Sequence, residues 1–257
     1  MAEEPRYQQG LVSIVTPVYK AERYIGDTIR SVQAQTYRNW ELLLIDDCSP
    51  DRSGEIILGM AASDDRLKYH RLEHNEGAAV ARNAAISHAQ GEYLAFLDSD
   101  DLWVPDKLER QLDFLHKHNA AFVFARIQMV DNDGNIVKSR IPIPARTDYR
   151  HLLRNTVIAT STVLLHRPTL KPFTMPLRRG GQDYATWLLL LRRTDYAYGQ
   201  DECLVSYRVG NDSLSSGKLK SIRQVYEIQT QDEHINRWSA CINTLCFCLH
   251  AFRKHYL

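Results

Sequence analysis

The chain has 257 residues, of which 44% are hydrophobic, and its 32 basic and 31 acidic residues give a formal net charge of +1. This hydrophobic content is enough to fill the core of one sizeable domain and argues against extensive disorder. A charge so nearly balanced creates no overall field that would recruit nucleic acid, so we expect no nucleic-acid partner.

Cysteine use and the N-terminus both favour a cytoplasmic location. The five cysteines lack the paired CxxC spacing of a zinc site, and we interpret them as reduced thiols. The first ten residues, MAEEPRYQQG, are charged and contain no apolar stretch of the kind that a signal peptide needs. We therefore expect a short N-terminal tail over residues 1–10 and a protein that stays inside the cell.

Short apolar stretches alternate with helical patterns in the first hundred residues. The stretches that predict buried strands are 11–16, 40–46, 67–72 and 92–97. The stretches with helical character between them are 22–35, 53–62 and 77–89. This order predicts an α/β protein with a Rossmann-like, mostly parallel sheet and helices on both faces.

The second half of the chain is less regular. Pro105 suits the first turn of a helix over 106–118, and residues 131–135, DNDGN, predict a hairpin turn after a strand at 121–130. A further strand is predicted at 160–166. With no low-complexity linker in the sequence, we expect one domain with a C-terminal helical appendage over 217–257.

Acidic residues gather where two of the predicted strands end: Asp46 and Asp47 after one, and Asp98, Asp100 and Asp101 after the other. Ligands of open parallel sheets bind beyond the carboxyl ends of the strands. An N-cap role would account equally well for Asp101 alone, which lies four residues before Pro105. It does not account for the whole set, whose mutual repulsion a cation or a hydroxyl-rich ligand would offset.

The ligand type indicates which cation is expected. Carboxylates with no neighbouring His or Cys suit Mg²⁺ or Mn²⁺, which complete their coordination with water and substrate phosphates. The chain has no GxxxxGK[ST] loop, because SSGKLK lacks a hydroxyl residue after Lys218, and no GxGxxG follows the first strand. ATP-loop and dinucleotide-binding interpretations therefore lose support.

Six segments in order resemble the family 2 glycosyltransferases, inverting enzymes of the GT-A fold that build bacterial surface polysaccharides. The segments are VSIVTPVYKAERYI, LLLIDDCSPDRS, NEGAAVARNAAI, LDSDD, GGQDYATWLLLL and YRVGNDSLS. The resemblance implies a GT-A domain over 11–216, with a nucleotide-binding half at 11–101 and an acceptor and catalytic-base half at 102–216. It also implies a UDP-sugar donor and, as acceptor, a growing surface glycan or a lipid-linked molecule.

The same resemblance assigns roles in the nucleotide-binding half. Pro17 and Tyr19 would line the nucleoside pocket, and Asp47 would accept the imide N–H of uracil. Asp98 would hold the ribose hydroxyls, and Asp100 would bind the Mn²⁺ or Mg²⁺ that bridges the phosphates and offsets charge on the leaving diphosphate. The nucleotide would also be faced by Arg82, for which the alternative is a solvated helix residue with a buried stem.

The resemblance makes Asp183 the base that removes the acceptor proton. On local sequence alone, Asp183 could instead cap the apolar helix 184–193. Two positions depart from the family pattern: Gln182 stands where Glu is usual, and Gly210 where His is frequent. In the absence of that histidine, Arg208, or one of Arg178 and Arg179, would supply the contact to the diphosphate.

The last stretch, 237–256, is apolar on most sides, but its apolar part is interrupted by Ser, Asn, Thr and His and is shorter than the ~20 apolar residues that span a bilayer. It would pack on the domain or on a second copy, or lie on a membrane with Trp238 and Phe252 in lipid and Arg253 and Lys254 near anionic headgroups. The second case predicts a peripheral protein at the inner face of the plasma membrane.

Two functions from other classes stay open on the sequence. A haloacid-dehalogenase-type phosphatase would use Asp98 as nucleophile and Asp100 as acid, although its motif should begin the chain and a downstream GDxxxD is missing. A catalytically inactive binding module of a polysaccharide synthesis complex is indicated only by Gln182.

Overall fold

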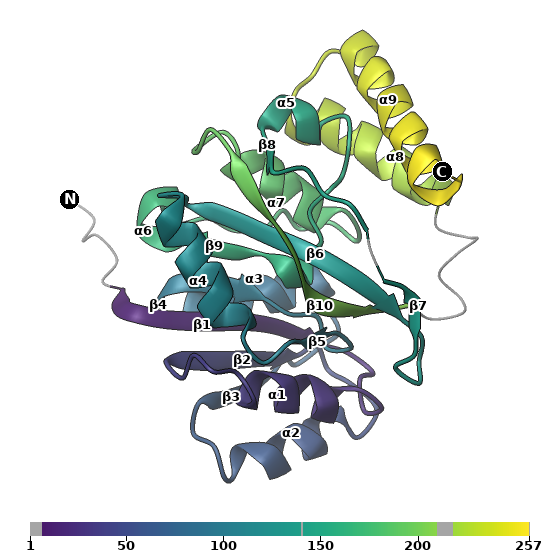
Figure 1. The fold of residues 1–257 in the computed structure, drawn as a ribbon. Helices are drawn as coiled ribbons and strands as arrows, with labels where there is room; N and C mark the ends of the chain where they lie inside the picture. The colour runs from purple at the N-terminus through teal and green to yellow at the C-terminus, as the bar shows by residue number, and fades with distance from the viewer. Residues whose placement is uncertain (1–6, 140, 210–217, 257) are drawn as a thin grey trace, which may run out of the picture.

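The computed structural model describes residues 7–139, 141–209 and 218–256, and a twisted central sheet runs through it (Figure 1). The first half of the sheet is parallel, as predicted, in the order β3-β2-β1-β4. Its strands are β1 (Gln8–Val18), β2 (Trp40–Asp46), β3 (Leu67–Arg71) and β4 (Gly91–Phe96). The helices between them are α1 (Ile25–Gln33), α2 (Ser53–Ala61) and α3 (Ala78–His88).

The second half extends the sheet as β9-β6-β10-β5, with β7 on β6 and β8 on β10. Its strands are β5 (Leu102–Trp103), β6 (Phe122–Val130), β7 (Ile136–Lys138), β8 (Arg146–Thr147), β9 (Leu164–His166) and β10 (Ala197–Arg208). Its helices are α4 (Lys107–Lys117), α5 (Tyr149–Leu152), a 3₁₀ turn (Thr160–Thr162), α6 (Arg167–Leu170) and α7 (Gln182–Leu190). The short β9 lies antiparallel between β4 and β6, so it joins the two halves.

Two local predictions in this half were wrong in detail. The predicted strand at 160–166 begins only at Leu164, because residues 160–162 form the 3₁₀ turn. Helix α4 begins at Lys107 with Asp106 at its N-cap, so Pro105 precedes the helix instead of lying in its first turn. The predicted hairpin is confirmed, since 131–135 connects the antiparallel strands β6 and β7.

Alternation along the central strands divides the core into two layers. Ile14, Leu42 and Leu44 pack with α1, α2 and α4 on one face. Val15 and Leu43 pack with α3 and α7 on the other. Successive strand residues point to opposite faces, so uniformly apolar strands such as β2 need helices on both sides.

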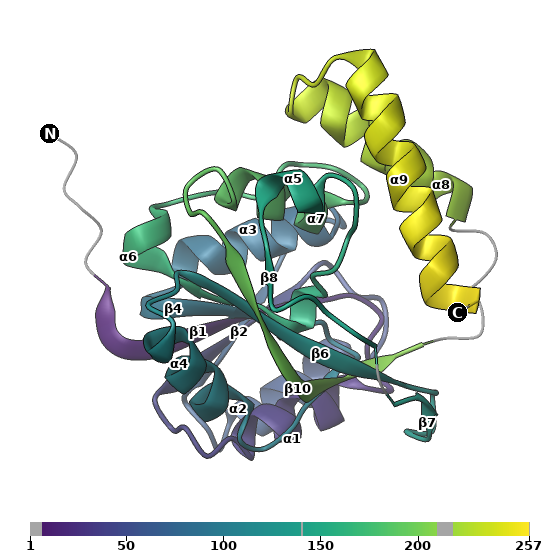
Figure 2. The ribbon, with the colours of Figure 1, turned by 45° about the horizontal axis from the view of Figure 1, so that its top comes forward.

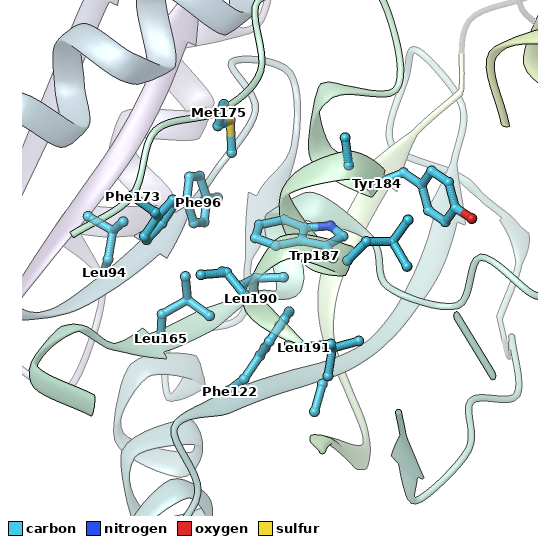
Figure 3. Packing of buried hydrophobic residues seen from close by; sticks show 14 of the residues in the cluster. Leu94, Phe96, Phe122, Leu165, Phe173, Met175, Tyr184, Trp187, Leu190 and Leu191 are labelled. Atoms are coloured by element: carbon cyan, nitrogen blue, oxygen red, sulfur yellow. The ribbon is translucent and has the colours of Figure 1, made fainter. Parts of the chain in front are cut away.

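Trp187 of α7 is the centre of the second layer (Figure 3). Its ring lies 5.4 Å, centroid to centroid, from both Phe96 of β4 and Phe122 of β6. Leu190 and Leu191 continue the same contact surface in Figure 3. This packing anchors α7, and with it Asp183 in its first turn, against the middle of the sheet.

The C-terminal segment consists of α8 (Lys218–Glu227), a π-helical turn (Ile228–Asp232) and α9 (Arg237–Tyr256), which lie together at the α5 end of the molecule (Figure 2). Val225 and Ile228 belong to the same core cluster as Trp187. A Cβ at Gly181 would lie 2.7 Å from the Ile228 side chain, so the segment packs closely on the start of α7.

Helix α9 packs on the domain along one side and is exposed along the other. Ala240 and Asn243 are buried, whereas Trp238 is 84% exposed. None of the described helices is long and apolar enough to cross a membrane. The side chains of Phe252, Arg253 and Lys254, named above for a membrane contact, lie outside the described residues, as does Gly210.

Candidate active site

The acidic residues predicted from the sequence meet at the carboxyl edge of the parallel strands. β1, β2 and β4 run in the same direction, so the loops that follow them leave from one edge. Residues 99–101 are held there by α1, whose Thr28 hydroxyl donates to the carbonyls of Ser99 and Asp101 at 3.0 Å each. The acidic residues that follow β2 and β4 in the sequence are therefore also close together in the structure.

Asp101 is a buried structural carboxylate. It accepts hydrogen bonds from the Ser161 hydroxyl at 2.5 Å and from the backbone N–H of Arg208 at 3.0 Å. Burial, together with the charges of Asp98 and Asp100, raises its pKa well above the usual range. The N-cap alternative is wrong, because the N-cap of α4 is Asp106. Asp101 instead ties the loop after β4 to the 3₁₀ turn and to the end of β10.

Asp100 is the carboxylate best suited to a metal ion. It is partly exposed, and burial together with the nearby charge of Asp98 raises its pKa despite the opposing charge of Arg208. A divalent cation would relieve this unfavourable charge. The described residues contain no group of three or more His, Cys, Asp or Glu side chains arranged around one ion. Carboxylate oxygens are the ligand type that suits Mg²⁺ or Mn²⁺, which complete their coordination with phosphates and water.

The side chain of Arg82, on α3, extends to the same edge of the sheet. Its guanidinium forms an ion pair with Asp98, and the residue is only 6% exposed. Burial alone would lower its pKa, but the charges of Asp98 and Asp183 outweigh that effect and raise it. The solvated-helix alternative for Arg82 is therefore wrong, and the residue is a buried cation near two of the predicted site carboxylates.

Asp47 organises the loop before α3. Its Oδ1 accepts the N–H of Glu76 at 2.7 Å, and its Oδ2 accepts the N–H of Gly77 at 2.8 Å and the Asn75 amide at 3.0 Å. These bonds hold the N-terminus of α3 and thus the direction of Arg82. The backbone N–H of Asp47 in turn donates to the carbonyl of Val18 at 2.8 Å.

The end of β1 lies beside Asp47 at this edge, since the Val18 carbonyl accepts the N–H of Asp47. Pro17 is partly buried and pairs in register with Ile45 of β2. Tyr19 follows β1 directly and is 44% exposed, so its ring is available for stacking. Together with Asp47 these residues form one side of the edge, with Asp98 and Asp100 on the neighbouring loop.

Asp183 lies in the first turn of α7. The N-cap of this helix is Gly181, whose φ of +70° favours glycine, so the capping alternative for Asp183 is wrong. Its Oδ2 accepts the Thr160 hydroxyl at 3.1 Å. Ser161, which follows Thr160 in the chain, accepts the N–H of Asp98 at 3.1 Å and donates to Asp101. A short path of hydrogen bonds therefore joins Asp183 to the loop at 98–101, which carries Asp98 and Asp100 and is called the DxD loop below.

Two of the three arginines predicted to contact a diphosphate, Arg208 and Arg178, already bond to other groups. Arg208 donates from Nε to the carbonyl of Asp100 at 3.0 Å and from one terminal nitrogen to the carbonyl of Asn132 at 3.0 Å. Arg178 pairs with Asp232 at 2.7 Å, and Arg179 is exposed. The part of the sixth family-like segment that follows Val209 lies outside the described residues.

Three site residues were missed in the sequence. Thr160 and Ser161 were read as part of a strand, although three consecutive hydroxyl residues, TST, could have suggested polar bonding. Tyr207 has its pKa raised by burial and by the charges of Asp101, Asp98, Asp100 and Asp183. Tyr207 is 37% exposed, and it directly precedes Arg208, whose backbone N–H donates to Asp101 at 3.0 Å.

Comparisons with known proteins agree with this geometry. The model of the family described as Glycosyl transferase family 2 matches residues 13–170. TuaG of Bacillus subtilis (strain 168), a glycosyltransferase assigned to teichuronic acid biosynthesis, is 42% identical over 94% of this chain and 94% of its own. WfgD of Escherichia coli, a UDP-Glc:alpha-D-GlcNAc-diphosphoundecaprenol beta-1,3-glucosyltransferase, is 38% identical over 85% of both chains.

Solved structures show the same fold. TarS of S. aureus in complex with UDP matches with a TM-score of 0.66 and 19% identity, over 89% of this chain and 68% of that chain. The mannosyltransferase PcManGT of Pyrobaculum calidifontis, in complex with GDP-Man and Mn²⁺, matches with a TM-score of 0.63 and 16% identity, over 91% and 66%. The chain therefore has the predicted GT-A fold.

Proposed function

Since the chain belongs to glycosyltransferase family 2 and is a glycosyltransferase of surface glycan biosynthesis, we propose that it takes its sugar from a UDP-sugar. The acceptor is a hydroxyl of a growing surface glycan or of a lipid-linked molecule, and transfer is metal-dependent and inverts the anomeric configuration. The observation that carries this proposal is the path from Asp183 through Thr160 and Ser161 to Asp98 and Asp101. These hydrogen bonds fix the position of Asp183, the candidate base, relative to Asp98 and Asp101.

Asp47 has room for one more donor. A carboxylate offers about four acceptor directions, and three are occupied by the loop at 75–77. The fourth would accept the imide N–H of uracil while Pro17 and Tyr19 pack on the base. The Asp47 carboxylate can only accept hydrogen bonds. It therefore favours uracil, whose ring has an imide N–H to donate, and this accounts for the preference for UDP.

Asp98 and Arg82 act as a pair at the ribose. The ion pair holds the direction of the Asp98 carboxylate, so that its remaining acceptor capacity can bind ribose hydroxyls. Arg208 holds the carbonyl of Asp100 and thus the position of the metal-binding carboxylate, and a direct contact of Arg208 with the diphosphate stays a prediction. Asp100 would hold the metal ion, whose positive charge would offset the charge on the departing diphosphate.

Asp183 removes the proton of the acceptor hydroxyl. Its place in the first turn of α7 and its hydrogen bond from Thr160 hold the direction of its carboxylate. The hydroxyl oxygen then attacks the anomeric carbon on the side opposite the diphosphate, and the bond to the diphosphate breaks. Single displacement of this kind inverts the anomeric configuration.

The two alternative functions, a phosphatase and an inactive binding module, are not supported. A haloacid-dehalogenase-type phosphatase is excluded because the chain belongs to family 2. An inactive binding module rested on Gln182, yet Gln182 begins α7 without displacing Asp183, which keeps its bond to Thr160. A glycosyltransferase is the function that uses both the DxD loop and Asp183.

The test is a panel of nucleotide sugars incubated with the chain and Mn²⁺, with release of nucleoside diphosphate as the readout. We expect UDP release from one or more UDP-sugars, faster with an acceptor, and a product whose anomeric configuration, read by NMR, is opposite to the donor's. Release of inorganic phosphate would indicate a phosphatase, and release of neither product would indicate a binding module.

The exposed side of α9 supports a peripheral membrane contact. Trp238, Ile242, Leu245 and Leu249 are each 57–84% exposed and recur at helical spacing, which defines one apolar stripe. A membrane surface is the occupant we propose, since the proposed acceptors include lipid-linked molecules; a second copy of the chain is the alternative. A cytoplasmic location at the inner face of the plasma membrane stays a prediction.

A further inference from the structure

A cavity of about 640 Å³ lies beside the catalytic carboxylate and has so far been given no role. It is bounded by β6, residues 141–143, residues 152–159, the start of α7 and the C-terminal helices, and Asp183 forms part of its wall. The volume is in the range of roughly 300–1,000 Å³ that is typical of small-molecule sites. The cavity is therefore large enough for part of a substrate that reacts at Asp183.

The wall of this cavity is mostly aliphatic and aromatic. Ile127 and Met129 of β6, Ile158, Val225 of α8 and Phe247 of α9 line it. Ile127, Met129, Ile158 and Phe247 are only partly buried in the chain as it stands. An apolar ligand would remove this surface from water, which is the main source of affinity in such pockets. The wall also carries polar side chains, among them Lys138, Thr156 and Gln224, so the chain-binding part is the apolar side formed by β6, Ile158, Val225 and Phe247.

The C-terminal helices close the cavity and are held there by a buried polar network. The Gln229 amide donates to the carbonyl of Leu153 at 2.8 Å, Asn243 of α9 donates to Gln229 at 3.0 Å, and Arg154 donates to Asn243 at 3.0 Å. Gln229 also donates to the hydroxyl of Tyr184 at 3.3 Å, and Tyr184 is the residue that follows Asp183 on α7. These bonds place α9 as the wall of a site instead of a detached tail.

Helix α9 presents apolar side chains on two opposite sides. Phe247 lines the cavity, while the stripe of Trp238, Ile242, Leu245 and Leu249 lies on the outside. At 100° per residue, position 247 is about half a turn from the centre of that stripe. A chain that begins in a lipid surface against the stripe and continues into the cavity would meet apolar contacts on both sides of the helix.

We propose that this cavity binds the aliphatic chain of the acceptor, and that the acceptor is therefore a lipid-linked sugar and not a free glycan. The inference rests on the proposed function, because it takes Asp183 as the base that the acceptor hydroxyl reaches. With the sugar at Asp183, the cavity receives the first part of the chain beyond the linking group. Selection of the acceptor class then resides in β6, α8 and α9, away from the nucleotide.

The test is calorimetric titration with farnesyl diphosphate and dimethylallyl diphosphate, which carry the same charged group on a long and a short isoprenoid chain. Saturating UDP and Mn²⁺ occupy the nucleotide site, so the diphosphate group cannot bind there. We expect the long-chain compound to bind roughly tenfold or more tightly, because each buried methylene adds affinity. Equal affinity for the two compounds would overturn the proposal.

Substitutions at Met129 locate the binding. Met129→Trp fills the cavity and should remove the long-chain preference, and Met129→Gln, which keeps the size but adds polarity, should reduce it. Met60→Trp on α2, a partly buried methionine outside the cavity, is the matched control and should retain the preference. A preference that survives both Met129 variants would place the chain elsewhere and refute the assignment.

The same variants separate this inference from the proposed function. UDP release from a UDP-sugar in the absence of acceptor depends on the nucleotide site alone and should be unchanged in Met129→Trp. Lost chain preference with unchanged UDP release supports the cavity assignment. Retained chain preference in a wild-type chain that releases no UDP from any donor would refute the proposed function and leave the cavity assignment standing.

Discussion

Replacement of Asp183 by Asn separates binding from chemistry at the site. The amide keeps the size of the carboxylate and can still accept the Thr160 hydroxyl, which lies at 3.1 Å, but it cannot take a proton. Loss of a general base lowers the transfer rate by about 10²-fold or more, which corresponds to ~2.7 kcal/mol in the activation barrier.

The same substitution should change stability far less. A negative charge in the first turn of α7 contributes about 0.3–1 kcal/mol through the helix dipole, and Arg82 keeps its ion pair with Asp98. We therefore expect a free energy of unfolding within about 1 kcal/mol of wild type. UDP affinity in the presence of Mn²⁺ should also be unchanged, since donor binding requires nothing of Asp183.

The assay measures UDP release at saturating donor and acceptor, with calorimetry for UDP and denaturant unfolding on the same preparations. Asp113→Asn, at an exposed position on α4, is the matched control and should transfer at the wild-type rate. If the Asp183 variant transfers sugar within a few-fold of wild type, Asp183 is not the base. If it loses UDP affinity as well, the separation between donor site and base is incorrect.

Asp100→Ala should abolish the metal-dependent part of UDP affinity while the chain stays folded, because the change removes carboxylate repulsion; equal UDP binding with and without Mn²⁺ in wild type would contradict this. Gly181→Ala should destabilise the chain by about 1–3 kcal/mol, because the φ of Gly181 is +70° and a Cβ there would lie 2.7 Å from a side-chain carbon of the π-helical turn. Gly59→Ala on α2, where a Cβ meets open space, is the control and should not destabilise it. Denaturant unfolding compares the two, and equal effects would contradict the close packing of the C-terminal segment. The wild-type chain should sediment with anionic lipid vesicles, and Trp238→Glu with Leu245→Glu should prevent it; a chain that stays in solution but forms a dimer sensitive to these changes would assign the stripe to a second copy.

Much of the donor side could be predicted from the sequence. Alternating apolar and helical stretches give a parallel sheet, and parallel strands bring their carboxyl ends to one edge. The positions of Asp47, Asp98 and Asp100 follow from that rule alone, because each comes within a few residues of a strand end. Local periodicity was sufficient here since the geometry of a parallel sheet repeats from one strand to the next.

The acceptor side depended on contacts between distant parts of the chain. Asp101 looked like a helix cap in its own segment, but it is bonded to Ser161 and to the N–H of Arg208, which are 60 and 107 residues away. Thr160 reaches Asp183 only because β9 enters the sheet antiparallel between β4 and β6. No pattern within a single segment predicts such an insertion.

The C-terminal helix shows the same division most clearly. The sequence predicted that residues 237–256 are helical and that their apolar part is too short and too interrupted to cross a bilayer, because apolar content and length are local properties. Only the tertiary structure decided that Asn243 and Phe247 turn inward to the catalytic helix while Trp238 and Leu245 remain outside. This orientation is supported by the buried Gln229, which accepts a hydrogen bond from the Asn243 amide, and by Arg154, which donates to the side-chain carbonyl oxygen of Asn243, so the buried polar side chain of Asn243 is paired.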